Sequence, residues 1–252
     1  MLIFTLAARE LRSLFLSPFA WCILAVVQII TAYLFLINLD TFRAVQAQLA
    51  AVDGAPGVTA IVIAPLLGVV GIILLLVVPM LTMRLISEER RNQTLSLLLS
   101  APLSMTQIIL GKYLGVLGFL MIMLSMIALM PLALLVGGSL DFGQFAAGLL
   151  GLALLLASFA AVGLFMSTLT RQPAVAAVSS FGILLLLWLI DWAGKAPADQ
   201  ASGLFSYLSL VHHYETLLKG VFNSTDVIYY LLIIITFLVL SIRRLDADRL
   251  QG

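Results

Sequence analysis

Six long runs of this sequence contain no Asp, Glu, Lys, Arg or His, and no other feature restricts the fold as strongly. A helix of about 20 apolar residues crosses the hydrocarbon core of a bilayer. Backbone amides in lipid must be hydrogen-bonded internally, and these runs lack the alternation of barrel strands, so we expect α-helices. The fold class is therefore an all-α polytopic membrane protein with six transmembrane helices. The predicted spans are Phe19–Ile37, Ile61–Met83, Leu114–Val136, Phe145–Leu169, Val175–Ile190 and Val227–Ile242.

The composition supports a membrane protein and argues against several other classes. Hydrophobic residues make up 63% of the chain and charged residues 10%, whereas about a quarter of the residues of a soluble domain are charged. The formal net charge is +1, so we expect no nucleic-acid partner. Cys22 is the single cysteine, which excludes a disulfide framework within the chain.

The Lys and Arg residues outside the spans predict the orientation of the chain, because they gather on the cytoplasmic side of a membrane. Ten of the 13 fall on one side if the chain crosses six times. We therefore expect both termini in the cytoplasm and the protein in the cell inner membrane. The ten residues are Arg9, Arg12, Arg84, Arg90, Arg91, Lys112, Arg171, Arg243, Arg244 and Arg249.

Three segments outside the spans are also expected to contain helices. Residues 1–17 place their apolar side chains on one helical face, which predicts an amphipathic interface helix that ends before Pro18. The alternative is that this segment is the start of span one. Residues Thr41–Val52 are helix-like. The external segment 191–226 is rich in leucine and aromatic residues, so we expect one or two short helices that dip into the outer leaflet. Four of its side chains are expected near the headgroups: Tyr207, His212, His213 and Tyr214.

The densest charge cluster of the chain opens the connection between spans two and three. Ser87 is suited to cap a helix, and Glu88 and Glu89 then lie in its first turn, where the helix dipole favours anions. Arg90 and Arg91 follow directly. A short cytoplasmic helix with charges at its head is suited to dock a soluble partner. The alternative is a solvated membrane anchor that follows the positive-inside rule.

The rest of this connection, within residues 84–112, predicts a break and a second helix. Leucines at helical spacing extend the first helix to about Leu99, and Pro102 ends it. Ser104 and Gln107 then have the spacing of a capping box, which starts the helix that enters span three.

Three stretches of the sequence carry a family resemblance. They read ARELRSLFLSPFAW near the N-terminus, ISEERRNQTLSLLLSAPLSMTQIILGKYLG between spans two and three, and YLSLVHHYETLLKGVFNSTDVIYYL before span six. In this order they resemble the opening, the first cytoplasmic loop and the last external segment of ABC type-2 permeases. The resemblance is greatest to the gliding-motility and multidrug-export-like branch, and it covers nearly the whole chain.

The resemblance implies the transmembrane subunit of an ATP-driven ABC exporter. In such families two permeases pair, as a homodimer or with a related permease, and each docks on a cytoplasmic ABC ATPase subunit. An auxiliary protein with a large periplasmic domain accompanies some members, and membrane lipid surrounds the spans. The partner ATPase binds ATP and Mg, so we expect no cofactor, no catalytic residue and no enzyme activity in this chain.

The resemblance also assigns roles to particular residues. The coupling helix, from Ser87 to about Leu99, would contact the ATPase through Ser87, Glu88, Glu89, Arg90, Arg91, Thr94 and Leu95. The turn between spans four and five would form a smaller second contact through Thr170, Arg171, Gln172 and Pro173. The interface helix, with Arg9, Glu10 and Arg12, would brace the coupling loop.

Motifs of two enzyme classes fail in this sequence. A P-loop requires Ser or Thr after Gly-Lys, but the pairs that begin at Gly111 and Gly194 are followed by Tyr and Ala. One family of intramembrane metalloproteases carries Glu-Glu-x-x-x-Arg, and here Gln93 stands in place of the arginine. The adjacent His212 and His213 lack the i, i+4 spacing of zinc ligands on a helix, so we expect no metal site.

An ion-coupled carrier or channel is the remaining alternative to an ABC permease. Ion and proton pathways usually need ionisable groups at membrane depth, and the predicted spans contain none. This pattern favours a partner that supplies the energy. Gly111 and Gly115 have the spacing of a close helix–helix contact, although incidental packing explains such a pair equally well.

Overall fold

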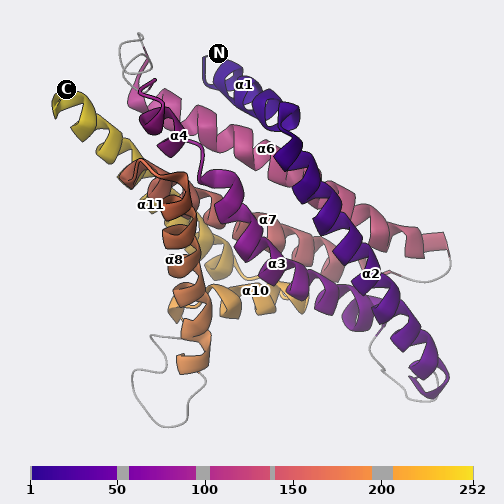
Figure 1. The fold of residues 1–252 in the computed structure, drawn as a ribbon. Helices are drawn as coiled ribbons and strands as arrows, with labels where there is room; N and C mark the ends of the chain where they lie inside the picture. Colours follow the sequence, from indigo (N-terminus) through magenta and orange to yellow (C-terminus); the bar gives the residue numbers. More distant parts are fainter. Residues whose placement is uncertain (1, 50–56, 95–102, 137–139, 195–206, 252) are drawn as a thin grey trace.

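The computed structural model describes residues 2–49, 57–94, 103–136, 140–194 and 207–251, and every regular element in these ranges is helical (Figure 1). The two termini and α4 lie at one end of the helix bundle, named here the terminal end. The other end is named the opposite end. The elements are α1 (Leu2–Leu16), α2 (Pro18–Leu49), the π-helical turn η1 (Thr59–Ile63), α3 (Ala64–Thr82), α4 (Ser87–Arg91), α6 (Met105–Leu132), the 3₁₀ turn η2 (Ala133–Val136), α7 (Phe142–Leu169), α8 (Pro173–Gly194), α10 (Leu210–Leu218) and α11 (Ser224–Gln251).

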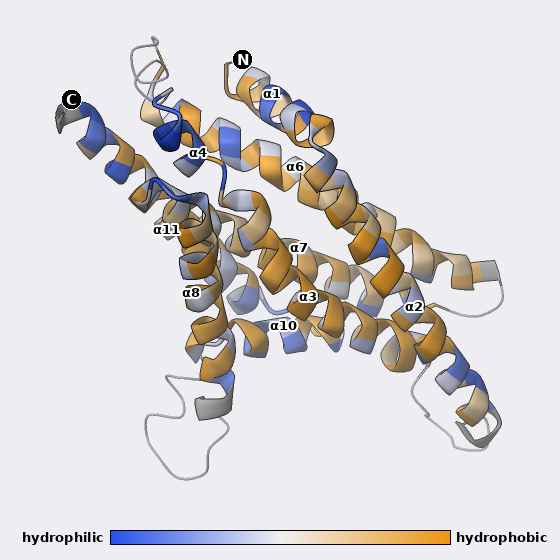
Figure 2. Ribbon diagram, in the orientation of Figure 1, coloured by the Kyte–Doolittle hydropathy of each residue, from blue (hydrophilic) through white to orange (hydrophobic). Residues whose placement is uncertain are grey.

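The described chain has six helices long and apolar enough to cross a membrane, one at each of the six predicted spans. In Figure 2 their middles are hydrophobic, whereas α4 and the last turns of α11 are hydrophilic. The first span differs from the prediction in length. α2 continues as one helix of 32 residues to Leu49, so the helix-like segment that begins at Thr41 is the end of this helix.

α3 and α7 form the centre of the bundle and approach closely where Gly163 faces Thr82. A Cβ atom on Gly163 would lie 2.8 Å from the Cβ of Thr82, closer than real Cβ atoms come. Helices in lipid gain stability when small residues let their backbones approach. Gly163 therefore sets the distance between the two central helices.

The N-terminal segment is a separate helix, as predicted, and α1 packs along α6 (Figure 1). The contact is close at two glycines of α6. A Cβ atom on Gly111 would lie 2.6 Å from the Cβ of Leu6, and one on Gly115 would lie 2.6 Å from the Cβ of Glu10. Gly111 and Gly115 therefore form a close helix contact, and its partner is α1 rather than another span.

α10 belongs to the segment that was predicted to be external, and it lies against α3, α7 and α8. Tyr214 is 1% exposed and donates a hydrogen bond of 2.8 Å to the carbonyl oxygen of Leu67 in α3. Burial raises the pKa of the Tyr214 hydroxyl far above its ordinary value, so this group remains a donor. A short helix was predicted here, and the rings of Tyr214 and His213, which were expected near the headgroups, are buried in the protein. Tyr207 and His212 are exposed.

His213 joins α10 to the start of α11. Its Nδ1 lies 2.7 Å from Oδ1 of Asp226, and its Nε2 lies 3.0 Å from the carbonyl oxygen of Tyr207. The ring also stacks on Tyr229, with the centroids 4.1 Å apart. The carbonyl oxygen of Tyr207 can only accept a hydrogen bond, so Nε2 is the donor in that contact. Protein groups thus occupy both ring nitrogens.

Candidate docking site at the terminal end

The first turn of α4 is held by Ser167 of α7. The Ser167 hydroxyl accepts hydrogen bonds of 3.0 Å from the backbone N–H groups of Ile86 and Ser87 and donates one of 3.1 Å to the carbonyl oxygen of Met83. The predicted capping role of Ser87 is wrong, because its hydroxyl donates to the Met83 carbonyl and is fully buried. A serine from another span therefore caps this helix.

The last turn of α4 closes earlier than predicted. Thr94 N–H bonds the carbonyl oxygen of Glu89 at 3.0 Å, and Gln93 N–H bonds that of Arg90 at 3.3 Å. This pair of bonds is a Schellman motif, and it places Gln93 in the left-handed region with φ of 58°. The predicted continuous helix from Ser87 to Leu99 is therefore wrong, since α4 stops at Arg91. Leu95, which was assigned to the ATPase contact, and Leu99 lie outside the described residues.

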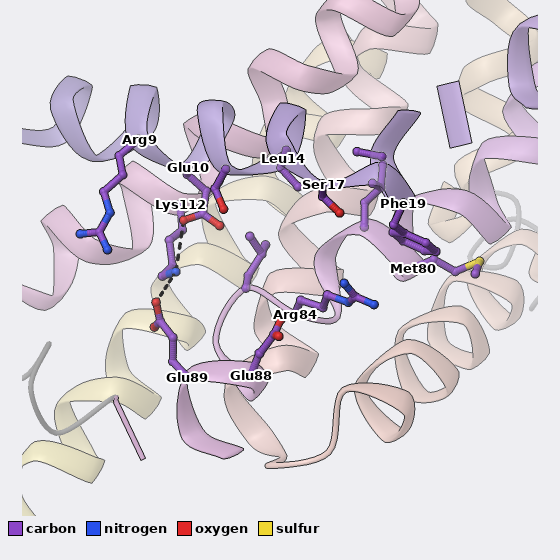
Figure 3. A pocket seen from close by; sticks show the side chains of 14 residues that line it. Arg9, Glu10, Leu14, Ser17, Phe19, Met80, Arg84, Glu88, Glu89 and Lys112 are labelled. Carbon is purple, nitrogen blue, oxygen red and sulfur yellow. Dashed lines mark hydrogen bonds and ion pairs between the residues drawn. The ribbon is translucent and has the colours of Figure 1, made fainter. Parts of the chain in front are cut away.

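Lys112 of α6 connects α4 with α1. Its Nζ lies 2.8 Å from Oε1 of Glu89 and 3.4 Å from Oε2 of Glu10 (Figure 3). Lys112 is only 8% exposed, and a lysine so deeply buried requires a carboxylate partner. The two ion pairs thus hold α1, α4 and α6 together, and they use Glu10 and Glu89 for contacts inside the protein.

Arg90 connects α4 with α11. Its Nη2 forms an ion pair with Oδ2 of Asp248, and Nη2 of Arg244 lies 3.5 Å from Oδ1 of the same carboxylate. The side chains of Arg90 and Asp248 are 12% and 16% exposed. One carboxylate near the end of the chain therefore binds two guanidinium groups, one from each helix.

Two charged residues of α4 remain exposed. Glu88 and Arg91 are exposed, and neither forms an ion pair with a described residue. Glu88 also lines the polar pocket between α1 and the start of α4 (Figure 3). Arg84, just before α4, is also exposed and lies over the ring of Phe19, 4.9 Å from its centroid. The charges predicted for docking thus divide into an inner pair and an outer pair.

A polar pocket of about 350 Å³ lies between α1 and the turn that leads into α4 (Figure 3). It is lined by charges of both signs, and Lys112 points between Glu10 and Glu89 on its wall. The other predicted residues of the interface helix, Arg9 and Arg12, are exposed, and Arg9 lines the pocket. Of the three residues predicted to brace the coupling loop, Glu10 is the one connected to it, through Lys112.

The predicted second contact is a turn between α7 and α8. The Thr170 hydroxyl accepts a hydrogen bond of 3.1 Å from the N–H of Gln172, and Pro173 begins α8. Arg171 and Gln172 are exposed. This turn begins three residues after Ser167, so it belongs to the same end of the bundle as α4.

The start of α6 has the predicted capping box. Gln107 N–H donates to the Ser104 hydroxyl at 3.2 Å, and Ser104 N–H donates to Oε1 of Gln107 at 3.1 Å. These bonds fix the beginning of the helix that carries Lys112. Local spacing was sufficient to predict this element because both partners lie within one turn.

Three residues that organise the site were not assigned to it from the sequence. Lys112 had a readable signal, since a lysine beside an apolar span needs acidic partners when it is buried. Ser167 and Asp248 had none, because serine is common in transmembrane helices and acids are common at helix ends. Their partners are about 80 and 158 residues away in sequence.

The six apolar helices and their helical connections define a multi-pass membrane protein. A family model described as ABC-2 family transporter protein matches residues 4–250, and the chain belongs to this family. It is therefore a membrane permease component of an ABC transporter, a class that works with an ATPase partner. A comparison with curated protein sequences found no match.

Proposed function

We propose that this chain is the permease subunit of an ABC exporter and that α4 is its coupling helix. ATP hydrolysis then takes place in a separate cytoplasmic ATPase that docks on the terminal end. The exported substrate, or a force transmitted to the periplasm, passes through the six-helix bundle and its partner permease. The positive charge of the terminal end supports its cytoplasmic position, and the protein would reside in the inner membrane.

The proposal rests on two features of α4, which is a helix of only five residues. Contacts from other helices hold it in place, and two of its charged side chains are exposed. An isolated helix of this length is unstable in water. Here Ser167, Lys112 and Asp248 hold α4 from three different helices. The outer pair, Glu88 and Arg91, remains available to a soluble partner. A simple connecting loop needs no such support.

The supporting contacts also suggest how motion would pass from the ATPase to the membrane. A force on α4 acts on α7 through Ser167, on α6 through Lys112 and on α11 through Asp248. Rigid helices transmit small displacements at one end along their whole length. The exposed turn from Thr170 to Pro173 would add the smaller second contact, and α1 would brace α6 at the membrane surface.

Permeases of this kind would work in pairs, either as a homodimer or with a related permease. Many large apolar side chains of α2, α8 and α11 are exposed in the single chain. Lipid and the second permease would cover these surfaces in the membrane. An auxiliary protein with a periplasmic domain would approach from the opposite end.

The proposal is tested by purifying the tagged chain from its native membrane in mild detergent and weighing the complex. We expect one cytoplasmic ATPase per permease and ATP hydrolysis that depends on the permease. The Glu88→Arg variant should weaken ATPase binding, because it reverses an exposed charge and leaves the Lys112 and Arg90 ion pairs in place.

Two further variants make this experiment specific. Asp246→Arg reverses an exposed acid on α11 at the same end, and it should leave the complex intact. Charge reversal of both Glu88 and Glu89 should weaken ATPase binding more than Glu88→Arg does, because it also breaks the ion pair of Glu89 with Lys112. A chain that hydrolyses ATP alone, or that purifies without any ATPase, would contradict the proposed function.

A further inference from the structure

The last turns of α11, which follow its apolar stretch, lie at the terminal end of the bundle, as α4 does (Figure 1). α11 has 28 residues, so it is about 42 Å long, compared with about 30 Å for a bilayer core. Its last turns are hydrophilic and project at the terminal end (Figures 1 and 2). The part of α11 beyond the apolar stretch is therefore free to contact other parts of the chain.

Asp248 lies on this extension and uses each carboxylate oxygen for a different arginine. Oδ2 accepts from Arg90 of α4, and Oδ1 lies 3.5 Å from Nη2 of Arg244, one turn earlier in α11. Arg244 thereby orients the carboxylate toward α4. An acid that follows its basic partner by four residues is the weaker order for stabilising a helix. The arrangement is thus better suited to holding α4 than to stabilising α11.

Partial burial makes this contact stronger than an ordinary surface ion pair. Exposed ion pairs are worth about 0–1 kcal/mol because water screens them. The side chains of Arg90 and Asp248 are 12% and 16% exposed, and a guanidinium–carboxylate contact is charge-assisted and directional. By comparison, Asp246 on the same extension is exposed and makes no ion pair with a described residue.

We propose that Asp248 is a positioning residue, which fixes α4 to the last span so that α4 and α11 move as one unit. Arg90 then acts inside the protein rather than as a direct ATPase contact. The positioning of α4 follows from the structure alone, whereas its consequence for coupling rests on the proposed function. The surface offered to the ATPase would consist of Glu88 and Arg91, with Asp248 behind them.

The positioning is tested by hydrogen exchange on the full chain in lipid nanodiscs. Asp248→Asn should speed amide exchange in residues 88–94 roughly fivefold or more, because it removes a charge-assisted contact of α4. Asp248→Glu keeps the carboxylate and should restore most of the protection. Asp246→Asn is the matched control, since it removes the same charge from the same helix, and it should leave exchange in α4 unchanged.

A double-mutant cycle identifies the partner. If Asp248 acts through Arg90, the Arg90→Gln and Asp248→Asn variants and their combination should all show the same exchange in residues 88–94. Additive effects would overturn the proposal, because they would mean that the two residues act separately. Equal exchange in Asp248→Asn and the wild type would also overturn it.

Coupling is measured on the ATPase that copurifies with the wild-type chain. Asp248→Asn should keep the amount of bound ATPase and the KM for ATP, but lower the permease-dependent kcat severalfold. A loss of ATPase binding equal to that of Glu88→Arg would instead make Arg90 part of the docking surface and overturn the inference. If the wild type binds no ATPase, the proposed function fails, while the exchange experiment still decides whether Asp248 positions α4.

Discussion

The two ends of the molecule are held together by different kinds of contact. At the terminal end, ion pairs of Lys112 and Asp248 connect α4 to α1, α6 and α11. At the opposite end, α10 is held by buried aromatic rings and short hydrogen bonds, such as that from Tyr214 to Leu67. The ion pairs depend on charge and direction, whereas the buried packed rings are costly to move because a cavity would be left behind.

If α4 is the coupling helix proposed above, this difference divides the molecule into a moving end and a fixed end. In the proposed function, the ion pairs let α4 move together with the helices that it contacts. A helix buried among α3, α7 and α8 benefits from contacts that preserve one arrangement. The packing at the opposite end is thus suited to preserve the arrangement of α10 against the spans. Four variants test this comparison.

The largest expected effect is the loss of a buried ring at the opposite end. Tyr214→Ala removes a fully buried side chain and its hydrogen bond to α3, and should lower the free energy of unfolding by about 3–5 kcal/mol. Unfolding in detergent micelles measures this change. Tyr207→Ala is the control, because Tyr207 is 52% exposed and should cost much less. Equal losses would mean that the buried ring of Tyr214 does not hold α10 in place.

A smaller loss is expected when α3 and α7 are forced apart. Gly163→Ala places a methyl group against Thr82, and overpacking of this kind costs about 1–3 kcal/mol. Thermal unfolding of the variant in detergent should show the loss. Gly182→Ala on α8 meets no atom within 4 Å and should be neutral or slightly stabilising. A neutral Gly163→Ala would mean that the central contact adjusts freely.

Removal of the cap of α4 should be detected locally at the terminal end. Ser167→Ala leaves the N–H groups of Ile86 and Ser87 without their acceptor, at a cost of about 1–2 kcal/mol. Amide exchange of Ile86 and Ser87 should rise roughly 5–30-fold. Ser158→Ala is the control, because the Ser158 hydroxyl bonds only the backbone of its own helix. Unchanged exchange in Ser167→Ala would contradict the capping role.

The smallest effect is expected for Lys112. Lys112→Gln weakens the link between α1 and α4 by about 1 kcal/mol, because Glu10 and Glu89 are partly exposed and water replaces the lost contacts. Amide exchange in residues 87–94 should therefore rise modestly. High salt should reduce the difference from the wild type, since salt screens ion pairs. Lys219→Gln, an exposed lysine at the opposite end, should change neither quantity. A salt-independent loss would show that packing, rather than charge, holds this link.

Local patterns predicted most of the fold. Apolar length was sufficient for the six spans, and the capping box was sufficient for the start of α6. The break before Pro18 separated α1 from α2 because proline lacks the N–H that a continuous helix would need. The end of α4 was missed because a non-glycine residue, Gln93, takes the left-handed conformation, which the leucine pattern concealed.

The sequence alone thus determined that the chain has six helices suited to cross a membrane and that its charges gather beside the second of them, because hydrophobicity and charge act over short stretches. Only the tertiary structure decided which of these charges face inward. Glu89 and Arg90 are neighbours of Glu88 and Arg91 in sequence, yet they bind Lys112 and Asp248 from distant helices. The physical reason is that an ion pair depends on which helices lie side by side, and packing of the spans alone determines this.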